Sequence, residues 1–217
     1  MTPETDRSSE VFGLILDWGG VLTTPVAPSF QSWANTEGIP YAVFESVMAL
    51  MHNTHESPLH LVEIGAITGR EFEVELATRM SRESGLQIPS DGLLQRLFAQ
   101  VAENKAMRDV AQAARSRGWT VAILSNTWGF GYDNESLLRI ADYLFLSEDL
   151  KLRKPMPEIY LEAANRISLD PTRCLFVDDL RRNVRGAEGV GMLSHLYTPG
   201  TEHEIRNLMD ELERRTL

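Results

Sequence analysis

Several acidic, hydroxyl and cationic side chains follow short apolar segments of this sequence, a pattern that suits metal and phosphate chemistry. Asp17 ends the run "LILD", and Asp178 and Asp179 follow the run "LFV". Ser125 follows "VAIL", and Lys154 lies in "LRKPMPEIY". Carboxylates at two such positions offer the hard oxygen ligands that Mg²⁺ prefers, whereas a single Asp is common at the start of any helix.

Together these side chains predict the transfer of a phosphoryl group. A carboxylate beside a bound cation, such as Asp17, can attack phosphorus and form an aspartyl phosphate. The Ser125 hydroxyl, nearby backbone amides and the Lys154 ammonium can bind phosphoryl oxygens and stabilise charge during transfer. Gly19 and Gly20 would let the backbone approach the ion and the phosphate closely. The alternative is that all of these residues are helix caps and surface ion pairs.

The elements that must position these residues are short apolar segments rich in β-forming residues. We expect strands at 12–16, 120–124, 143–147, 173–177 and 192–197. From residue 120 onward they alternate with helix-like segments, which is typical of a parallel α/β sheet covered on both faces. Because open parallel sheets bind ligands beyond the carboxyl ends of their strands, the polar strand ends should meet in one crevice.

A long stretch between the first two expected strands has helical character instead. The segments "YAVFESVMALM", "GREFEVELATRM" and "DGLLQRLFAQVAEN" all have the spacing of amphipathic helices. A single crossover helix would need far fewer residues. We therefore expect a small helical cap domain at 25–104, inserted into a Rossmann-like core formed by 11–24 and 105–217. Residues 1–10 are expected to form a flexible tail.

Composition limits the partners and the compartment of the protein. The formal net charge of −10 over 217 residues argues against nucleic acid or an anionic membrane as the main partner. The single cysteine excludes an internal disulfide framework and suits a reducing compartment, so we expect a cytoplasmic protein. The first apolar run is too short to span a bilayer. We expect a monomer or a homodimer.

The polar strand ends also carry a family resemblance. The chain resembles the haloacid dehalogenase (HAD) superfamily of hydrolases, in the group whose helical cap follows the first motif. "LILDWGGVLTT" resembles motif one and "VAILSNT" motif two, while "LRKPMPEIY" resembles motif three and "LFVDDLRRNVRGAEGVGM" motif four. The four motifs occur in the family's order over about residues 11–198. They identify the superfamily and leave the substrate open.

The resemblance implies a role for each matching residue. Asp17 would be the nucleophile and a Mg²⁺ ligand, with the Gly19 carbonyl and Asp179 as further ligands. Asp178 and Asn183 would orient the metal site. The residues implied to bind phosphate are Ser125, Asn126, Gly20 and Lys154. The expected function is Mg²⁺-dependent hydrolysis of a small phosphorylated metabolite.

Gly19 departs from the pattern of the family's phosphatases. They usually carry a second Asp two residues after the nucleophile, which protonates the leaving group and then activates water. Here that position is Gly19, so the backbone carbonyl is kept and the acid is lost. A positioned general acid or base contributes about 10²–10⁴-fold. The alternative function is therefore a catalytically weak or inactive relative that binds a phosphate ligand or a protein partner.

Two related activities fit the sequence less well. The family's dehalogenases use no metal and carry an arginine near the start of the cap, but no Arg or Lys occurs here between Asp17 and Arg70. Phosphonoacetaldehyde hydrolases need a cap lysine, but the first lysine of this chain is Lys105, after the expected cap. The phosphatase interpretation is therefore favoured.

Histidines and tryptophans near the expected crevice allow two interpretations. The stretch "MHNTHESPLH" holds His52, His55 and His60, one of which could supply the missing acid. They could equally be solvated residues of a polar loop. Trp18 and Trp128 could line the crevice or simply pack beside the strand ends.

Overall fold

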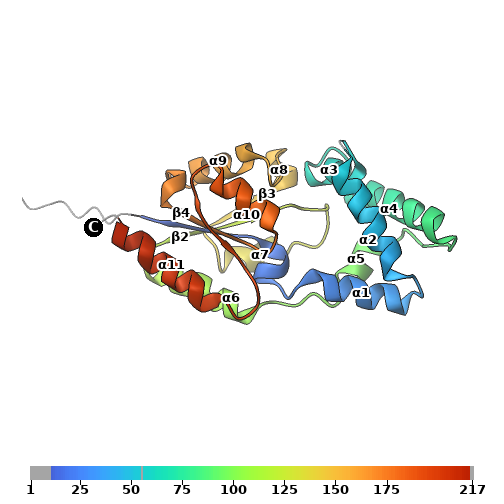
Figure 1. The fold of residues 1–217 in the computed structure, drawn as a ribbon, viewed down its shortest axis with the longest axis horizontal. Helices are drawn as coiled ribbons and strands as arrows, with labels where there is room; N and C mark the ends of the chain where they lie inside the picture. Colours follow the sequence, from blue (N-terminus) through green and yellow to red (C-terminus); the bar gives the residue numbers. More distant parts are fainter. Residues whose placement is uncertain (1–10, 55, 216–217) are drawn as a thin grey trace, which may run out of the picture.

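A parallel five-stranded sheet with helices on both faces forms the centre of the molecule (Figure 1). The computed structural model describes residues 11–54 and 56–215, so the expected tail at 1–10 and His55 lie outside the described residues. The strand order is β3-β2-β1-β4-β5. The strands are β1 (Gly13–Leu16), β2 (Thr120–Ser125), β3 (Tyr143–Leu146), β4 (Cys174–Asp178) and β5 (Leu193–Leu196). The expected Rossmann-like α/β class is confirmed, and each expected strand is present with no end shifted by more than one residue.

Alternating strand residues pack into two separate cores, because successive side chains of a strand point to opposite faces. Leu14 and Leu16 belong to a cluster that includes residues of α6 (Lys105–Ser116) and α11 (Glu202–Arg215). Ile15, between them, belongs to a second cluster with residues of α9 (Pro157–Arg166). Burial on both faces explains why β1 is a continuous apolar run up to Asp17.

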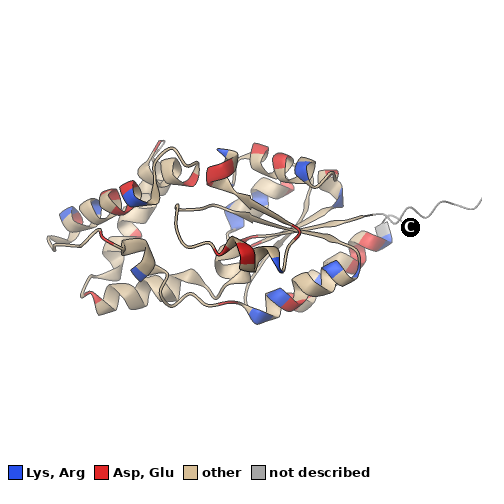
Figure 2. Cartoon of the chain, turned by 180° about the vertical axis from the view of Figure 1, so that it is seen from behind, with Lys and Arg blue, Asp and Glu red and all other residues tan. Residues whose placement is uncertain are grey.

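Charged residues lie mainly on the helices, the long helix α11 among them (Figure 2). Helix α10 (Arg181–Glu188) packs on β4 and β5. The short elements are α7 (Asn134–Leu138), α8 (Ser147–Leu150), η1 (Trp18–Leu22) and η2 (Pro171–Arg173). Among the described residues, no helix has both the length and the apolar character that crossing a bilayer would require.

Five further helices pack around a core of their own, at one end of the sheet (Figure 1). They are α1 (Val26–Thr36), α2 (Tyr41–Asn53), α3 (Pro58–Glu63), α4 (Gly69–Ser84) and α5 (Leu93–Leu97). Thr68 and Glu71 form a capping box that starts α4, and Gly85 in a left-handed conformation ends it. We refer to these helices, α1–α5, as the helical layer.

Two expectations for the helical layer need correction. The helix expected over "DGLLQRLFAQVAEN" is only the five residues of α5, because residues 98–100 form turns and the chain then pairs with residues 22–24. Helix α1 was not expected, although Pro25 and Pro28 suit a helix start, where no backbone N–H is needed. Its burial of Phe30 and Trp33 against other helices stabilises it.

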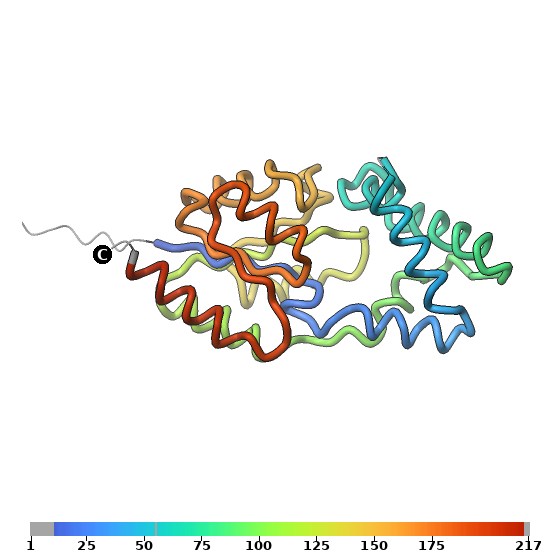
Figure 3. Tube along the Cα trace, in the orientation of Figure 1, coloured from blue at the N-terminus to red at the C-terminus, as the bar shows by residue number. Residues whose placement is uncertain are grey.

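The segment before α1 and the segment after α5 run side by side where they connect the helical layer to the sheet (Figure 3). Thr23 and Glu103 form an antiparallel bridge. The Thr24 amide donates to the Ala102 carbonyl at 2.7 Å, and the Asn104 amide donates to the Leu22 carbonyl at 2.9 Å. The paired segments coincide with the expected boundaries at 24/25 and 104/105, but the division into two domains stays a prediction.

Candidate active site

The strand order places two acidic strand ends next to each other. β1 lies between β2 and β4, and Leu16 is in register with Val177. The Asp17 amide donates to the Val177 carbonyl at 2.9 Å, which continues the pairing of β1 with β4 by one residue. Asp17 and Asp178 therefore leave the sheet together at the point where the strand order reverses, the usual place for a ligand in such folds.

The Lys154 ammonium forms a buried ion pair with each of these two acids. Its Nζ lies 2.7 Å from an Asp17 carboxylate oxygen and 2.7 Å from an Asp178 carboxylate oxygen. The residue is only 1% exposed. Asn126 fixes the lysine's backbone: its Oδ1 accepts from the Lys154 amide at 2.8 Å and its Nδ2 donates to the Lys154 carbonyl at 3.0 Å. The amide of Asn126 therefore positions Lys154, besides lining the cleft described below.

Both carboxylate oxygens of Asp178 have protein partners, whereas Asp179 is less enclosed. Asp178 accepts from the Leu180 amide at 2.8 Å and from Asn183 Nδ2 at 3.0 Å. It has no exposed surface. Asp179 is half-buried. The arrangement leaves Asp178 committed to protein partners and Asp179 available to a ligand.

Burial and crowding of acids dominate the electrostatics of this site. Burial raises the pKa of Asp17, Lys154 opposes the rise, and the charges of Asp178 and Asp179 add to it. Burial also raises the pKa of Asp179 to about 6, with a contribution from Asp178. Burial would lower the pKa of Lys154, but the charges of Asp17 and Asp178 outweigh it and raise the pKa. One ammonium faces three carboxylates, so the site favours a further cation.

The donor set fits a hard divalent cation. Oxygens of Asp17, Asp178 and Asp179 all lie within 4.8 Å of one another. Asn183 Oδ1 is buried and, among the described residues, has no hydrogen-bond partner. Mg²⁺ needs only one or two carboxylates together with water and phosphate oxygens. The residues present therefore suit Mg²⁺, and they include the expected ligands Asp17 and Asp179.

The two glycines after Trp18 have different environments. Gly20 has a left-handed backbone (φ 76°), and a Cβ added there would clash with the Asp179 carboxylate. Gly19 has an ordinary extended backbone (φ −69°, ψ 122°), and the nearest atom to an added Cβ is a Val26 methyl at 3.7 Å. Gly20 is therefore required for the approach of Asp179, whereas Gly19 has room for a side chain.

Gly20→Ala is expected to destabilise the protein by about 1–2 kcal/mol, because Ala is strained in the left-handed region and would displace Asp179. Gly19→Ala is the matched control and should change stability by less than about 0.5 kcal/mol. Urea unfolding of both variants measures the difference. Equal losses from the two substitutions would contradict the role given to Gly20.

The hydroxyl of Ser125 lies at the end of β2, on the expected phosphate side. It is buried and forms a hydrogen bond of 2.9 Å with the Tyr132 hydroxyl. Burial raises the pKa of Tyr132 well above its usual value, although its bond to Ser125 opposes the rise. Tyr132 therefore stays a neutral hydrogen-bonding group. It was not among the expected site residues, since nothing in "WGFGYDNES" marks a loop tyrosine as a neighbour of β2.

A cleft of about 440 Å³ lies between the sheet and the helical layer, and these residues lie in it. Asp17, Gly19, Ser125, Asn126, Lys154 and Asp179 all contribute to its lining. Much of the rest is aromatic and comes from both parts of the molecule. The main rings are Trp18, Phe30, Phe44, Phe98, Trp128 and Phe130. Trp18 and Trp128 thus both line the cleft and pack against other rings.

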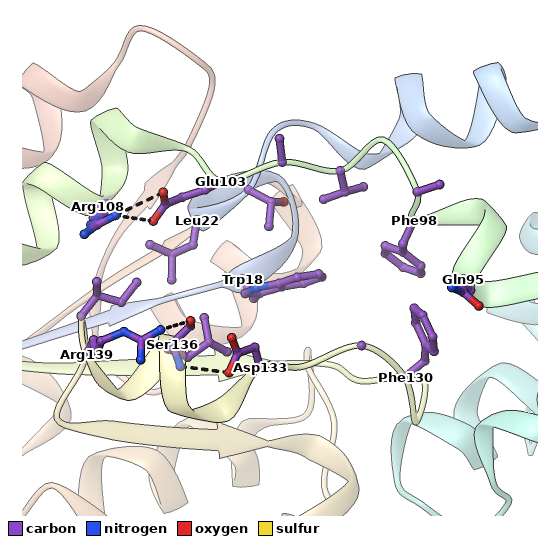
Figure 4. A pocket seen from close by; sticks show the side chains of 17 residues that line it. Trp18, Leu22, Gln95, Phe98, Glu103, Arg108, Phe130, Asp133, Ser136 and Arg139 are labelled. Atoms are coloured by element: carbon purple, nitrogen blue, oxygen red, sulfur yellow. Dashed lines mark hydrogen bonds and ion pairs between the residues drawn. The ribbon is translucent and has the colours of Figure 1, made fainter.

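A second cleft, of about 680 Å³, adjoins the first on the far side of Trp18 (Figure 4). Trp18, Phe98 and Phe130 line both clefts, and Figure 4 shows the Trp18 ring extending toward the other two. None of the acids at the strand ends lines this larger space. The candidate site therefore lies in the smaller cleft.

The sequence matches the haloacid dehalogenase-like hydrolase family over residues 13–191. The chain belongs to this family. The match includes the four expected motifs, which confirms the family resemblance and establishes the chain as a HAD-like hydrolase.

Individual relatives of this HAD-like hydrolase have different activities. Bifunctional epoxide hydrolase 2 of Mus musculus is 25% identical over 216 residues, which cover 92% of this chain but only 38% of that protein. (S)-2-haloacid dehalogenase 4A of Burkholderia cepacia is 33% identical over 111 residues, 46% of each chain. A HAD family enzyme of Bacteroides thetaiotaomicron, solved with magnesium and inorganic phosphate, has a TM-score of 0.61 at 20% identity, covering 88% of this chain and 96% of that one. The last similarity shows the fold.

A buried ion pair joins the helical layer of this HAD-like hydrolase to the loop between α8 and α9, which carries Lys154. Glu63 of α3 pairs with Arg153, the neighbour of Lys154. Burial raises the pKa of Glu63, and Arg153 opposes the rise. The Ser147 hydroxyl donates to the Glu63 carbonyl. Neither Glu63 nor Arg153 was an expected site residue, because their pairing depends on how α3 docks against the sheet.

His52 lines the smaller cleft, and no other histidine of the described residues does so. Its Nε2 lies 3.5 Å from an Arg182 guanidinium nitrogen, while His60 lies in α3. Burial, followed by the charges of Arg182 and Arg153, lowers the pKa of His52 to about 4. His52 is therefore neutral near pH 7 and is a poor substitute for the acid absent at Gly19.

The His52 contribution to the unfolding free energy is expected to fall as the pH drops from about 6.5 to about 4, in the opposite direction to the contributions of Asp17 and Asp179, whose pKa values are raised. Between these values the unfolded chain, with an ordinary pKa of 6.5 at this residue, binds more protons than the folded protein. The stability of His52→Gln relative to the native protein should therefore rise between pH 7 and pH 4.5. Urea unfolding at several pH values measures this slope, and an unchanged slope in the variant would contradict the lowered pKa.

Proposed function

We propose that this HAD-like hydrolase is a Mg²⁺-dependent phosphatase of a small phosphorylated metabolite, with Asp17 as the nucleophile. The observation that carries the proposal is the buried contact of Lys154 with Asp17 and Asp178 beside a third acid, Asp179, at the strand ends that meet the cleft. The Bacteroides thetaiotaomicron relative, whose structure holds magnesium and phosphate, supports the same chemistry.

In the first step Asp17 would attack the phosphorus of the substrate. Lys154 holds the Asp17 carboxylate in place and, with the Ser125 hydroxyl, balances the negative charge of the phosphoryl oxygens. Mg²⁺, held by Asp17, Asp179 and the Gly19 carbonyl, would neutralise phosphate charge and align the phosphoryl group. Asp178 and Asn183 keep Lys154 and the acids oriented. The product of this step is an aspartyl phosphate at Asp17.

In the second step water would attack the aspartyl phosphate and restore the carboxylate of Asp17. The position that usually carries the acid and base is Gly19, which lines the cleft without a side chain. Protonation of the leaving group and activation of water then lack an enzyme group at this position. We expect a slow second step, and with it accumulation of the aspartyl phosphate when the leaving group is good.

Two other functions deserve comparison with the phosphatase. Binding of a phosphate ligand without turnover is favoured by the glycine at position 19 alone. Two observations oppose dehalogenation. The cluster of three acids suits a cation, which dehalogenases of this family do not use. Arg70, the first arginine after Asp17, pairs with Glu73 and Asp91 and does not line the cleft, so it is not placed to bind a halide there. The phosphatase accounts for Lys154 and all three acids together.

Metal removal tests the proposal. Treatment with EDTA is expected to abolish release of phosphate from acetyl phosphate, and added Mg²⁺ should restore it, since only the cation balances the three carboxylates. Phosphate release is measured directly, and circular dichroism before and after chelation controls for unfolding. Full activity in EDTA would contradict a metal-dependent reaction, and release of halide from 2-haloacids would favour dehalogenation instead.

A further inference from the structure

The walls of the active-site cleft indicate the chemical class of the substrate. We propose that the protein hydrolyses aryl phosphates, in which the phosphate is esterified to the hydroxyl of an aromatic ring; this rests on the phosphatase function proposed above. Two independent features carry it: a chain of aromatic rings that begins beside the nucleophile, and an open space where the leaving-group acid would be.

The aromatic rings form a continuous wall from the reacting centre into the helical layer. Trp18, next to Asp17 in sequence, lies 4.8 Å from Tyr132 and 6.2 Å from Phe98, measured between ring centroids. Phe98 lies 5.7 Å from Trp128, which stacks on Phe30 at 6.1 Å with an interplanar angle of 24°. A flat ring attached to a phosphate at Asp17 would contact this wall on leaving the strand ends.

Apart from Asn183, Lys154 and the residues at the strand ends, the polar side chains that line the cleft are those of Tyr41, Glu45, His52, Glu63, Tyr132 and Arg182, and the rest of the lining is aromatic or aliphatic. Glu63 is engaged by Arg153, and Asn126 by the backbone of Lys154. His52 and Arg182 lie next to each other. A ring with several hydroxyl groups would leave hydrogen bonds unmade against the aromatic side chains, and each unmade bond is costly. The cleft therefore favours an apolar, planar group.

The space at Gly19 points to a leaving group that needs little protonation. Here the step would form a bond between an Asp17 oxygen and phosphorus while the bond from phosphorus to the aryl oxygen breaks. The electron pair leaves on the aryl oxygen, which takes its proton from solvent. A phenol has a pKa of about 10, as for tyrosine, so its anion leaves more easily than that of an alcohol, whose pKa is closer to the value of about 16 for water.

Water then attacks phosphorus, the bond between phosphorus and Asp17 breaks, and the products are a phenol and inorganic phosphate. Acyl phosphates meet the leaving-group condition but leave the aromatic wall without a contact. Alkyl phosphates with apolar chains can contact the wall but have poor leaving groups. Aryl phosphates satisfy both conditions.

Three phosphates separate these conditions: phenyl phosphate, cyclohexyl phosphate and acetyl phosphate. With the native protein and Mg²⁺, kcat/KM for phenyl phosphate is expected to exceed that for cyclohexyl phosphate by about 10³-fold or more. Gly19→Asp, for which the structure has space, should raise kcat/KM for cyclohexyl phosphate by about 10²–10⁴-fold. It should change kcat/KM for 4-nitrophenyl phosphate little, because kcat/KM reports the first step and an acid helps only poor leaving groups there.

Truncation of the wall tests its part in recognition. Phe130→Ala removes an exposed ring that lines the cleft and lies 6.4 Å from Phe98 between ring centroids. It should lower kcat/KM for phenyl phosphate about tenfold while leaving acetyl phosphate unchanged. Tyr143→Ala, at a ring that is 40% exposed on β3, is the matched control and should change neither substrate.

The outcomes distinguish the two levels of the proposal. Faster turnover of phenyl phosphate, sensitive to Phe130→Ala, supports the aryl class. Equal kcat/KM for phenyl and cyclohexyl phosphates, or turnover of acetyl phosphate alone, overturns the aryl class and leaves the phosphatase intact. Absence of phosphate release from all the substrates, 4-nitrophenyl phosphate included, in the presence of Mg²⁺ overturns the phosphatase and the aryl class with it.

Discussion

Asp17→Asn is expected to lower turnover of phosphate esters by at least about 10⁴-fold, because an amide of the same shape cannot act as the nucleophile. The substitution keeps a hydrogen-bonding oxygen 2.7 Å from Lys154 Nζ. It also removes one of three crowded carboxylates whose burial is unfavourable. The folded structure should therefore survive, and the loss should be confined to kcat. Steady-state assays with Mg²⁺ at saturating substrate measure the effect.

A remote acid provides the control for Asp17→Asn. Asp170 caps the short element η2 at an exposed position, where its carboxylate accepts from the Thr172 amide at 2.9 Å. Asp170→Asn should leave turnover unchanged, since it lies away from the cleft lining. Retention of most of the native turnover by Asp17→Asn, with Mg²⁺ present, would place the nucleophile elsewhere.

Lys154→Met is expected to lower the free energy of unfolding by about 3–5 kcal/mol and to abolish turnover. The Lys154 ammonium lies between Asp17 and Asp178 and is almost completely buried, so its removal leaves like charges together without a counter-charge. The loss should be smaller with saturating Mg²⁺, which would replace part of the missing positive charge. Urea unfolding with and without Mg²⁺ measures both effects.

The neighbouring lysine provides a matched control. Lys151→Met removes an exposed ammonium that donates to the Gly65 carbonyl at 3.3 Å, and it should change stability by less than about 0.5 kcal/mol. Adding Asp178→Asn to Lys154→Met should recover part of the lost stability, because it removes one of the unpaired acids. Equal stability of Lys154→Met and Lys151→Met would show that the buried contacts of Lys154 contribute little.

The residues at the strand ends could be predicted because parallel strands bring their carboxyl ends together. Asp17, Ser125 and Asp179 follow buried apolar runs, so their proximity required only the class of the sheet and the order of its strands. Lys154 was predictable by its motif and its distance along the chain from β3. These signals are local, and the fold converts them into one site.

The rest of the site depends on contacts between segments far apart in sequence. Phe30 of α1 and Trp128 of the loop after β2 stack because the helical layer docks on the sheet, and no periodicity in either segment predicts it. Asn126 was expected to bind phosphate, but its side chain also holds the Lys154 backbone, a bond specified by loop geometry. Tyr132 was missed for the same reason.

Trapping of a phosphorylated enzyme is the most direct test of the central claim that Asp17 receives the phosphoryl group. Native protein mixed with 4-nitrophenyl phosphate and Mg²⁺, quenched in acid within the first turnovers, should carry one phosphoryl group on the peptide that contains Asp17. Mass spectrometry of the digested protein locates it, and nitrophenol should be released in an initial burst because the second step is slow. A phosphoryl group on any other residue, or turnover without a labelled Asp17 peptide in repeated rapid quenches, would contradict the account.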